Sequence, residues 1–108
     1  MNSIVIVDDH AMLRQGYCAL LSQKPDFTIL FDAENGNELL IKLLDSPVFP
    51  DLILMDFQMP VLNGISTTLI VKNLYPKSKI IIMSVYEHEH TIMNSFRAGA
   101  DGFVSKNC

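Results

Sequence analysis

Three aspartates that follow apolar segments are the residues of this chain best suited to chemistry. Asp8 and Asp9 come directly after the apolar residues 4–7, and Asp56 comes directly after the apolar residues 52–55. If these two segments form neighbouring parallel strands, the three carboxylates lie together at one edge of a sheet. Like charges held that close repel one another, so the cluster must bind protons or recruit a cation.

A small dication such as Mg²⁺ suits this set of ligands. It binds oxygen, keeps several of its waters, and is held in proteins by one or two carboxylates together with the phosphate oxygens of a substrate. The alternative for Asp8 and Asp9 is that they only cap the following helix, as aspartate commonly does. Ser84 and Lys106 follow two further apolar segments, and their hydroxyl and ammonium groups can bind anionic oxygens.

Short apolar segments alternate along the chain with segments of helical period. The apolar segments predict five strands, at residues 4–7, 27–31, 52–55, 80–83 and 103–104. Several are apolar at successive positions, as expected for parallel strands covered on both faces. Parallel strands need right-handed crossovers, so the pattern predicts an α/β, doubly wound parallel sheet. Such sheets bind their ligands at the carboxyl ends of the strands.

Helices are expected between the strands, with Asn63 as the cap of the third. Their apolar stripes comprise Leu13, Tyr17, Leu20 and Leu21; Leu39, Leu40, Leu43 and Leu44; Ile65 and Leu69; and Ile92, Met93 and Phe96. The sequence stops directly after the fifth strand. We therefore expect the helix that would follow to be missing, and apolar surface beside the first helix to be exposed.

Length and composition argue against several classes of protein. The 108 residues suffice for one domain, and 49% hydrophobic residues exclude disorder. A net charge of −4 without a basic cluster argues against nucleic-acid binding by this segment alone. The apolar segments are far shorter than the ~20 residues that span a bilayer, and no secretory signal opens the chain. Because Cys18 and Cys108 make no disulfide framework, we expect a cytoplasmic protein without membrane contact.

The combination of these residues resembles the receiver domain of two-component response regulators over residues 1–108. No single part of the combination is specific, but the whole is highly specific. The opening looks most like the NarL/FixJ subfamily, whose members carry a C-terminal LuxR-type helix-turn-helix. The resemblance is carried by Val7-Asp8-Asp9-His10 with Leu13-Arg14-Gln15-Gly16, by residues 51–60 with Asn63-Gly64, by Ser84, and by residues 99–103 with Lys106.

The resemblance implies a flavodoxin-like fold with five parallel strands in the order 2-1-3-4-5, and a signalling switch that catalyses only its own phosphorylation and dephosphorylation. Asp56 matches the phosphoacceptor, whose carboxylate attacks the phosphohistidine of a sensor histidine kinase. Asp9 and Asp56 would bind Mg²⁺ directly, together with the backbone carbonyl of Gln58. Asp8 would act mainly through water.

The resemblance also implies how phosphorylation is sensed. Ser84 and Lys106 would hold the phosphoryl oxygens, and Phe103 would turn inward behind Ser84. The alternative for Phe103 is an ordinary core aromatic. Gln58 and Tyr86 match positions that tune the lifetime of the phosphoryl group. The implied partners are a histidine kinase, a second copy of the chain after phosphorylation, and DNA through a C-terminal domain absent from this chain.

Three other functions stay open from the residues. A pseudo-receiver would switch without being phosphorylated. A haloacid-dehalogenase-like phosphohydrolase would also form an aspartyl phosphate, but that family expects an aspartate two positions later, where Gln58 stands. A flavodoxin-like flavin carrier would need a first loop that cradles a phosphate, and Asp8 and Asp9 would repel that phosphate.

Overall fold

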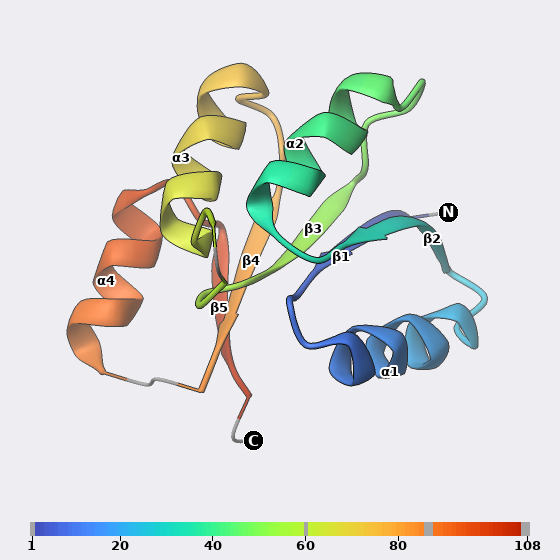
Figure 1. Cartoon of the computed structure of the whole chain (residues 1–108), viewed down its shortest axis with the longest axis horizontal. Helices are drawn as coiled ribbons and strands as arrows, with labels where there is room; N and C mark the ends of the chain where they lie inside the picture. The colour runs from blue at the N-terminus through green and yellow to red at the C-terminus, as the bar shows by residue number, and fades with distance from the viewer. Residues whose placement is uncertain (1, 60, 86–87, 107–108) are drawn as a thin grey trace.

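The computed structural model describes residues 2–59, 61–85 and 88–106, and in these ranges strands alternate with helices (Figure 1). Each predicted strand is present and is one or two residues longer than predicted. The strands are β1 (Asn2–Val7), β2 (Phe27–Ala33), β3 (Leu52–Asp56), β4 (Ile80–Ser84) and β5 (Gly102–Ser105). The helices are α1 (Ala11–Ser22), α2 (Gly36–Asp45), α3 (Gly64–Leu74) and α4 (Glu89–Arg97).

The five strands form one parallel sheet in the order β2-β1-β3-β4-β5, which confirms the predicted fold class. The chain leaves β1 for β2 at one edge and then returns across β1 to β3, so the strand order reverses at β1. Val7 at the end of β1 is paired with Met55 in β3. The residues that follow these two strands therefore share one edge of the sheet, where α/β proteins of this kind bind ligands.

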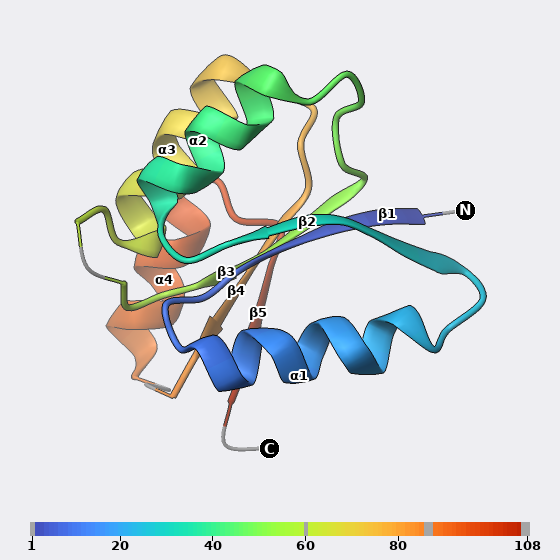
Figure 2. The ribbon, with the colours of Figure 1, turned by 45° about the vertical axis from the view of Figure 1, so that its right-hand side comes forward.

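The helices cover the two faces of the sheet unequally (Figure 2). Helices α2, α3 and α4 lie on one face, and α1 lies on the other face against β1 and β2. The core lies between the sheet and the three helices, and its strand side chains at the centre of the sheet are fully buried. These are Val5, Val7, Ile53, Met55, Ile80 and Ile82, packed with Leu39 and Leu43 of α2 and Val71 of α3.

The face that carries α1 has exposed apolar surface, as the sequence predicted. None of the residues of α1, all of which the structure describes, is buried. Leu20 is 62% exposed, and a cavity of about 250 Å³ lies between α1 and strands β3, β4 and β5. This α1 groove is lined by Tyr17, Leu20, Leu21, Leu54, Ile81, Met83 and Val104.

The predicted apolar stripes of α3 and α4 were wrong in part, because Ile65 and Ile92 are half-buried but the other members are exposed. Leu69 is 51% exposed, and Met93 and Phe96 are exposed as well. The buried residues of these helices are mostly small or polar, namely Gly64, Thr67 and Thr68 beside the apolar Val71 in α3, and Thr91 and Ser95 in α4. Among the described residues, no helix is long and apolar enough to cross a membrane.

Candidate functional site

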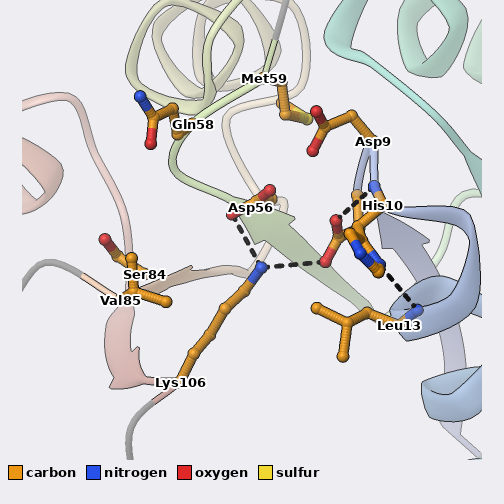
Figure 3. Close-up of a pocket in the computed structure, with 10 residues that line it drawn as sticks. Asp9, His10, Leu13, Asp56, Gln58, Met59, Ser84, Val85 and Lys106 are labelled. Carbon is orange, nitrogen blue, oxygen red and sulfur yellow. Dashed lines mark hydrogen bonds and ion pairs between the residues drawn. The ribbon is translucent and has the colours of Figure 1, made fainter.

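Side chains that follow four neighbouring strands line one cavity of about 540 Å³ (Figure 3). Asp8 follows β1, Asp56 ends β3, Ser84 ends β4 and Lys106 follows β5. Because all four strands are parallel, their carboxyl ends meet at this edge of the sheet. The cavity is also lined by Asp9, His10, Leu13, Gln58, Met59 and Val85.

The three aspartates lie together as predicted. One oxygen from each of Asp8, Asp9 and Asp56 lies within 4.8 Å of the other two. Asp8 is fully buried and Asp56 is only 6% exposed, whereas Asp9 is exposed at the rim. Two acids are thus largely removed from water. In this buried position their mutual repulsion is poorly screened.

Lys106 is the cation that faces these acids. Its Nζ lies 3.0 Å from Asp8 Oδ2 and 3.0 Å from Asp56 Oδ1, so one ammonium bridges two carboxylates. Its backbone N–H donates to the carbonyl of Ser84 (2.8 Å), which fixes the stem of the side chain at the end of β4. Burial lowers the pKa of Lys106, but the hydrogen bonds to Asp8 and Asp56 outweigh it, and the net pKa is raised.

Asp56 stays difficult to ionise in spite of this lysine. Burial raises the pKa of Asp56 to about 6, and the charges of Asp8 and Asp9 add to that rise, while Lys106 opposes it. One ammonium therefore does not neutralise the whole cluster. The site retains an unmet demand for positive charge, which a bound cation would supply.

The donor set fits a hard divalent cation. Three carboxylates that converge within 4.8 Å offer oxygen ligands of the kind that Mg²⁺ prefers. Asp9 and Asp56 would bind the ion, and Gln58 lines the same cavity two residues after Asp56. The raised pKa of Asp56 agrees with this assignment, because a carboxylate crowded by like charges gains most from a cation.

The β1–α1 loop is held by hydrogen bonds, and the sequence-based alternative of an aspartate cap was wrong. His10 is the N-cap of α1, and its Nδ1 accepts from the N–H of Leu13 (3.3 Å). Asp8 Oδ1 instead accepts from the N–H of His10 (2.9 Å). Arg14 donates from Nη1 to the carbonyl of Asp8 (2.8 Å). The buried carboxylate of Asp8 is thereby fixed on the cavity side of the loop.

The β3–α3 loop brings a helix N-terminus up against the backbone of Asp56. Asn63 caps α3 as predicted, with its side chain accepting from the N–H of Ser66 (2.8 Å). The N–H of Gly64 donates to the carbonyl of Phe57 (2.9 Å). A Cβ at Gly64 would lie 2.3 Å from the carbonyl oxygen of Asp56, so only glycine permits this approach.

The remaining predicted site residues divide into three cases. Ser84 is buried and lines the cavity beside Lys106, and Gln58 lines it near Asp56 (Figure 3). Tyr86 lies outside the residues that the structure describes. Phe103 is half-buried and packs against the core, which agrees with an ordinary core aromatic.

Sequence analysis missed the parts played by His10 and Arg14. A signal for Arg14 was present, because a residue in the first turns of a helix directs its side chain back toward the helix N-terminus. Arg14 stands six residues after Asp8, within reach of the loop that carries the acids. No comparable pattern pointed to the capping role of His10, since histidine is not among the common N-cap residues.

Comparisons with known proteins agree with this geometry. The profile of the response regulator receiver domain family matches residues 4–108. The chain is 39% identical over 105 residues to the nitrate/nitrite response regulator protein NarL of Escherichia coli K12, covering 97% of the chain and 48% of that protein. The chain thus spans about half the length of this relative.

Solved structures show the same fold. A two-component response regulator of the LuxR family from Aurantimonas superposes with a TM-score of 0.90 at 27% identity, covering 98% of this chain and 74% of that one. The response regulator TrrA of Thermotoga maritima, solved in complex with Mg²⁺-BeF, superposes with a TM-score of 0.84 at 30% identity. That match covers 98% of this chain and 87% of the other.

Proposed function

Because the chain belongs to the response regulator receiver family, with a NarL-type regulator among its relatives, we propose that it is a phosphorylation-dependent signalling switch. Asp56 is the phosphoacceptor. The observation that carries this proposal is that the largely buried carboxylate of Asp56 lies 3.0 Å from the ammonium of Lys106, in a cavity that two further acids share.

The donor of the phosphoryl group is the phosphohistidine of a sensor histidine kinase. A carboxylate oxygen of Asp56 forms a bond to phosphorus while the bond from phosphorus to the histidine nitrogen breaks, and the imidazole leaves. Asp9, Asp56 and the backbone carbonyl of Gln58 would hold Mg²⁺, which would supply positive charge to neutralise the phosphoryl oxygens. Asp8 would act on that ion mainly through water.

Lys106 and Ser84 hold the transferred group. The ammonium of Lys106 already faces Asp56, and a compact point charge there binds a phosphoryl oxygen well. The hydroxyl of Ser84 lines the same cavity from the end of β4. As Ser84 moves toward the phosphoryl group, Phe103 turns inward behind it. Gln58 and Tyr86 set how quickly water removes the phosphoryl group.

The partners of this switch follow from the family. They are a histidine kinase, a second copy of the chain after phosphorylation, and DNA through a domain outside these 108 residues. A further domain is supported by the relative NarL, of which this chain covers 48%. A cytoplasmic location is part of the same proposal.

Intact-mass measurement after incubation with acetyl phosphate tests the phosphoacceptor. We expect one phosphoryl adduct on the unmodified chain in the presence of Mg²⁺ and none in excess chelator. Asp56→Asn should abolish the adduct. Asp51→Asn, which removes an exposed acid at the opposite end of the sheet, should leave it unchanged.

Two results would contradict the proposal. An adduct that persists in Asp56→Asn would place the phosphoryl group elsewhere. No adduct on this chain or on one extended beyond residue 108 would favour a pseudo-receiver that switches without phosphorylation.

A further inference from the structure

Arg14 links the acidic cavity to a strand outside it, and the proposed chemistry makes no use of this residue. Its Nη1 donates to the backbone carbonyl of Asp8 (2.8 Å), and its Nε donates to Asp32 Oδ2 (2.6 Å). We propose that Arg14 is a positioning residue, which holds the loop of Asp8 and Asp9 where it binds a divalent cation. This inference builds on the proposed function, in which the cation has its role.

The loop needs such a restraint for two reasons. Asp8 and Asp9 face Asp56 across the cavity, and the single ammonium of Lys106 balances the repulsion among the three carboxylates only in part, so the remaining repulsion pushes the loop outward. Helix α1, which follows the loop, has no buried residue among its twelve, so the end of the helix next to the loop is open to solvent. Asp9 is exposed, so the position of its carboxylate follows from the path of the loop backbone.

Asp32 supplies a fixed point for the guanidinium. It lies in β2, and its own backbone carbonyl accepts from Lys42 Nζ of α2 (2.7 Å). A planar guanidinium that donates through two nitrogens is fixed in direction as well as in distance. The loop is therefore tied through Arg14 to β2, and β2 is tied through Lys42 to a helix on the other face.

The positive charge of Arg14 and its positioning role predict opposite changes in Mg²⁺ affinity when Arg14 is replaced, which makes the inference testable. The guanidinium lies 2.8 Å from the backbone oxygen of Asp8, well within the Debye length of about 10 Å at 0.1 M salt. A positive charge so close to the site repels a dication, so removing it would tighten Mg²⁺ binding on electrostatic grounds. A loop released from its restraint would bind Mg²⁺ more weakly.

The experiment measures the Mg²⁺ dissociation constant of the unmodified protein and of Arg14→Met by calorimetry. It is done at low salt and again at about 1 M salt, where the Debye length is about 3 Å and the lost charge matters little. At high salt we expect Arg14→Met to bind Mg²⁺ about tenfold more weakly, at the lower end of the range for residues that orient metal ligands. Amide resonances of residues 8–10 should shift in the variant before any Mg²⁺ is added.

Lys72→Met is the matched control. Lys72 pairs with Asp101 at 2.8 Å, and its side chain is 19% exposed against 16% for Arg14, but it lies away from the cavity. The Lys72→Met variant should unfold at a lower denaturant concentration than the unmodified protein, without any change in Mg²⁺ affinity. Asp32→Ala, which removes the acceptor for Arg14 Nε and leaves Arg14 in place, should weaken Mg²⁺ binding at high salt as Arg14→Met does.

The outcomes separate this inference from the proposed function. Equal or tighter Mg²⁺ binding by Arg14→Met and Asp32→Ala at high salt would overturn the positioning role. Equal weakening in Lys72→Met would overturn it too, because any loss of stability would then suffice. Absence of Mg²⁺ binding by the unmodified protein would instead count against the proposed cation site itself.

Discussion

At the scale of single residues, Asp56 is an acid whose surroundings oppose its charge. Burial raises its pKa to about 6 from an ordinary 3.8, so the folded protein binds a proton between these values where the unfolded chain does not. Stability therefore falls as the pH rises from about 4 to about 6, and the cost persists above that range. For an acid that stabilises the fold by its charge, stability would instead rise with pH.

Neutralising this acid should stabilise the fold. In chelator at pH 7.5, we expect Asp56→Asn to raise the free energy of unfolding by at most about 3 kcal/mol, the equivalent of about two pKa units. The gain should vanish near pH 4, where Asp56 is protonated in the folded protein. Urea unfolding at both pH values checks this, and a loss of stability at pH 7.5 would show that the ion pair with Lys106 dominates.

Asp101 provides a control of opposite sign. Burial raises its pKa, but hydrogen bonds from Lys72 Nζ (2.8 Å) and from the N–H of Ile80 (2.9 Å) outweigh that effect, and the pKa is lowered overall. Asp101→Asn should therefore destabilise the protein at pH 7.5 in the same urea series. This loss should disappear as the pH falls below about 4, since the unfolded chain binds its proton first on acidification.

Much of the candidate site was predictable at this scale, for a simple geometric reason. Asp8, Asp56, Ser84 and Lys106 each stand at or just after the end of a strand, and the ends of parallel strands meet. The contacts of Arg14 with Asp8 and Asp32 were not predicted. They depend on the path of a loop and on the direction of a long side chain. The spacing of apolar residues along the sequence indicates neither.

At the scale of elements, strands were predicted well and the faces of helices poorly. A parallel strand covered on both faces needs apolar side chains at successive positions, so its signal is a continuous run. Helices α3 and α4 instead approach the sheet through small residues. Thr67 Oγ1 donates to the carbonyl of Asn63 (2.7 Å) and Ser95 Oγ to that of Thr91 (2.9 Å), so these hydroxyls are buried with their hydrogen bonds made inside the helix.

The close approach of α3 to the site gives a prediction about glycine. Gly64→Ala would place a methyl group 2.3 Å from the carbonyl oxygen of Asp56, so the helix or the strand end must shift. We expect a loss of about 1–3 kcal/mol in the free energy of unfolding. Acetyl phosphate labelling should slow as well, because the displaced atoms belong to Asp56.

Gly16 in α1 is the matched control for this substitution. A Cβ there meets nothing within 4 Å, and the residue lies inside a helix. Gly16→Ala should therefore stabilise the protein by about 0.5–1 kcal/mol without changing the labelling rate. Equal effects of the two substitutions on stability would show that α3 is not packed as closely as described.

At the scale of the whole molecule, the unequal cover of the sheet is the main feature. Three helices protect one face, whereas α1 alone leaves the α1 groove open to water. An apolar groove of this kind is a place for further protein to pack. We propose that a helix following residue 108 in the full-length protein fills it.

A chain extended by that helix should be more stable than the 108-residue chain. Covering even one large aliphatic side chain contributes about 1.5–3 kcal/mol, which would raise Tm by several degrees in a domain of this size. The Leu20→Lys substitution distinguishes stabilisation by covering the α1 groove from a general effect of chain length. It should be nearly neutral in the short chain, where Leu20 is exposed, and destabilising in the extended one. Equal Tm values for the two chain lengths would refute the proposal.

The ion pair between Lys106 and Asp8 also bears on how the protein folds. It joins residues 98 positions apart, and β5, which carries Lys106 to the site, is an edge strand paired with β4. Such distant contacts form slowly, because the chain must first lose the entropy of a long loop. An intermediate in which β5 has not yet docked would hold the acids without their ammonium. Docking of β5 would therefore complete the sheet and bring the ammonium of Lys106 to the acids in a single step.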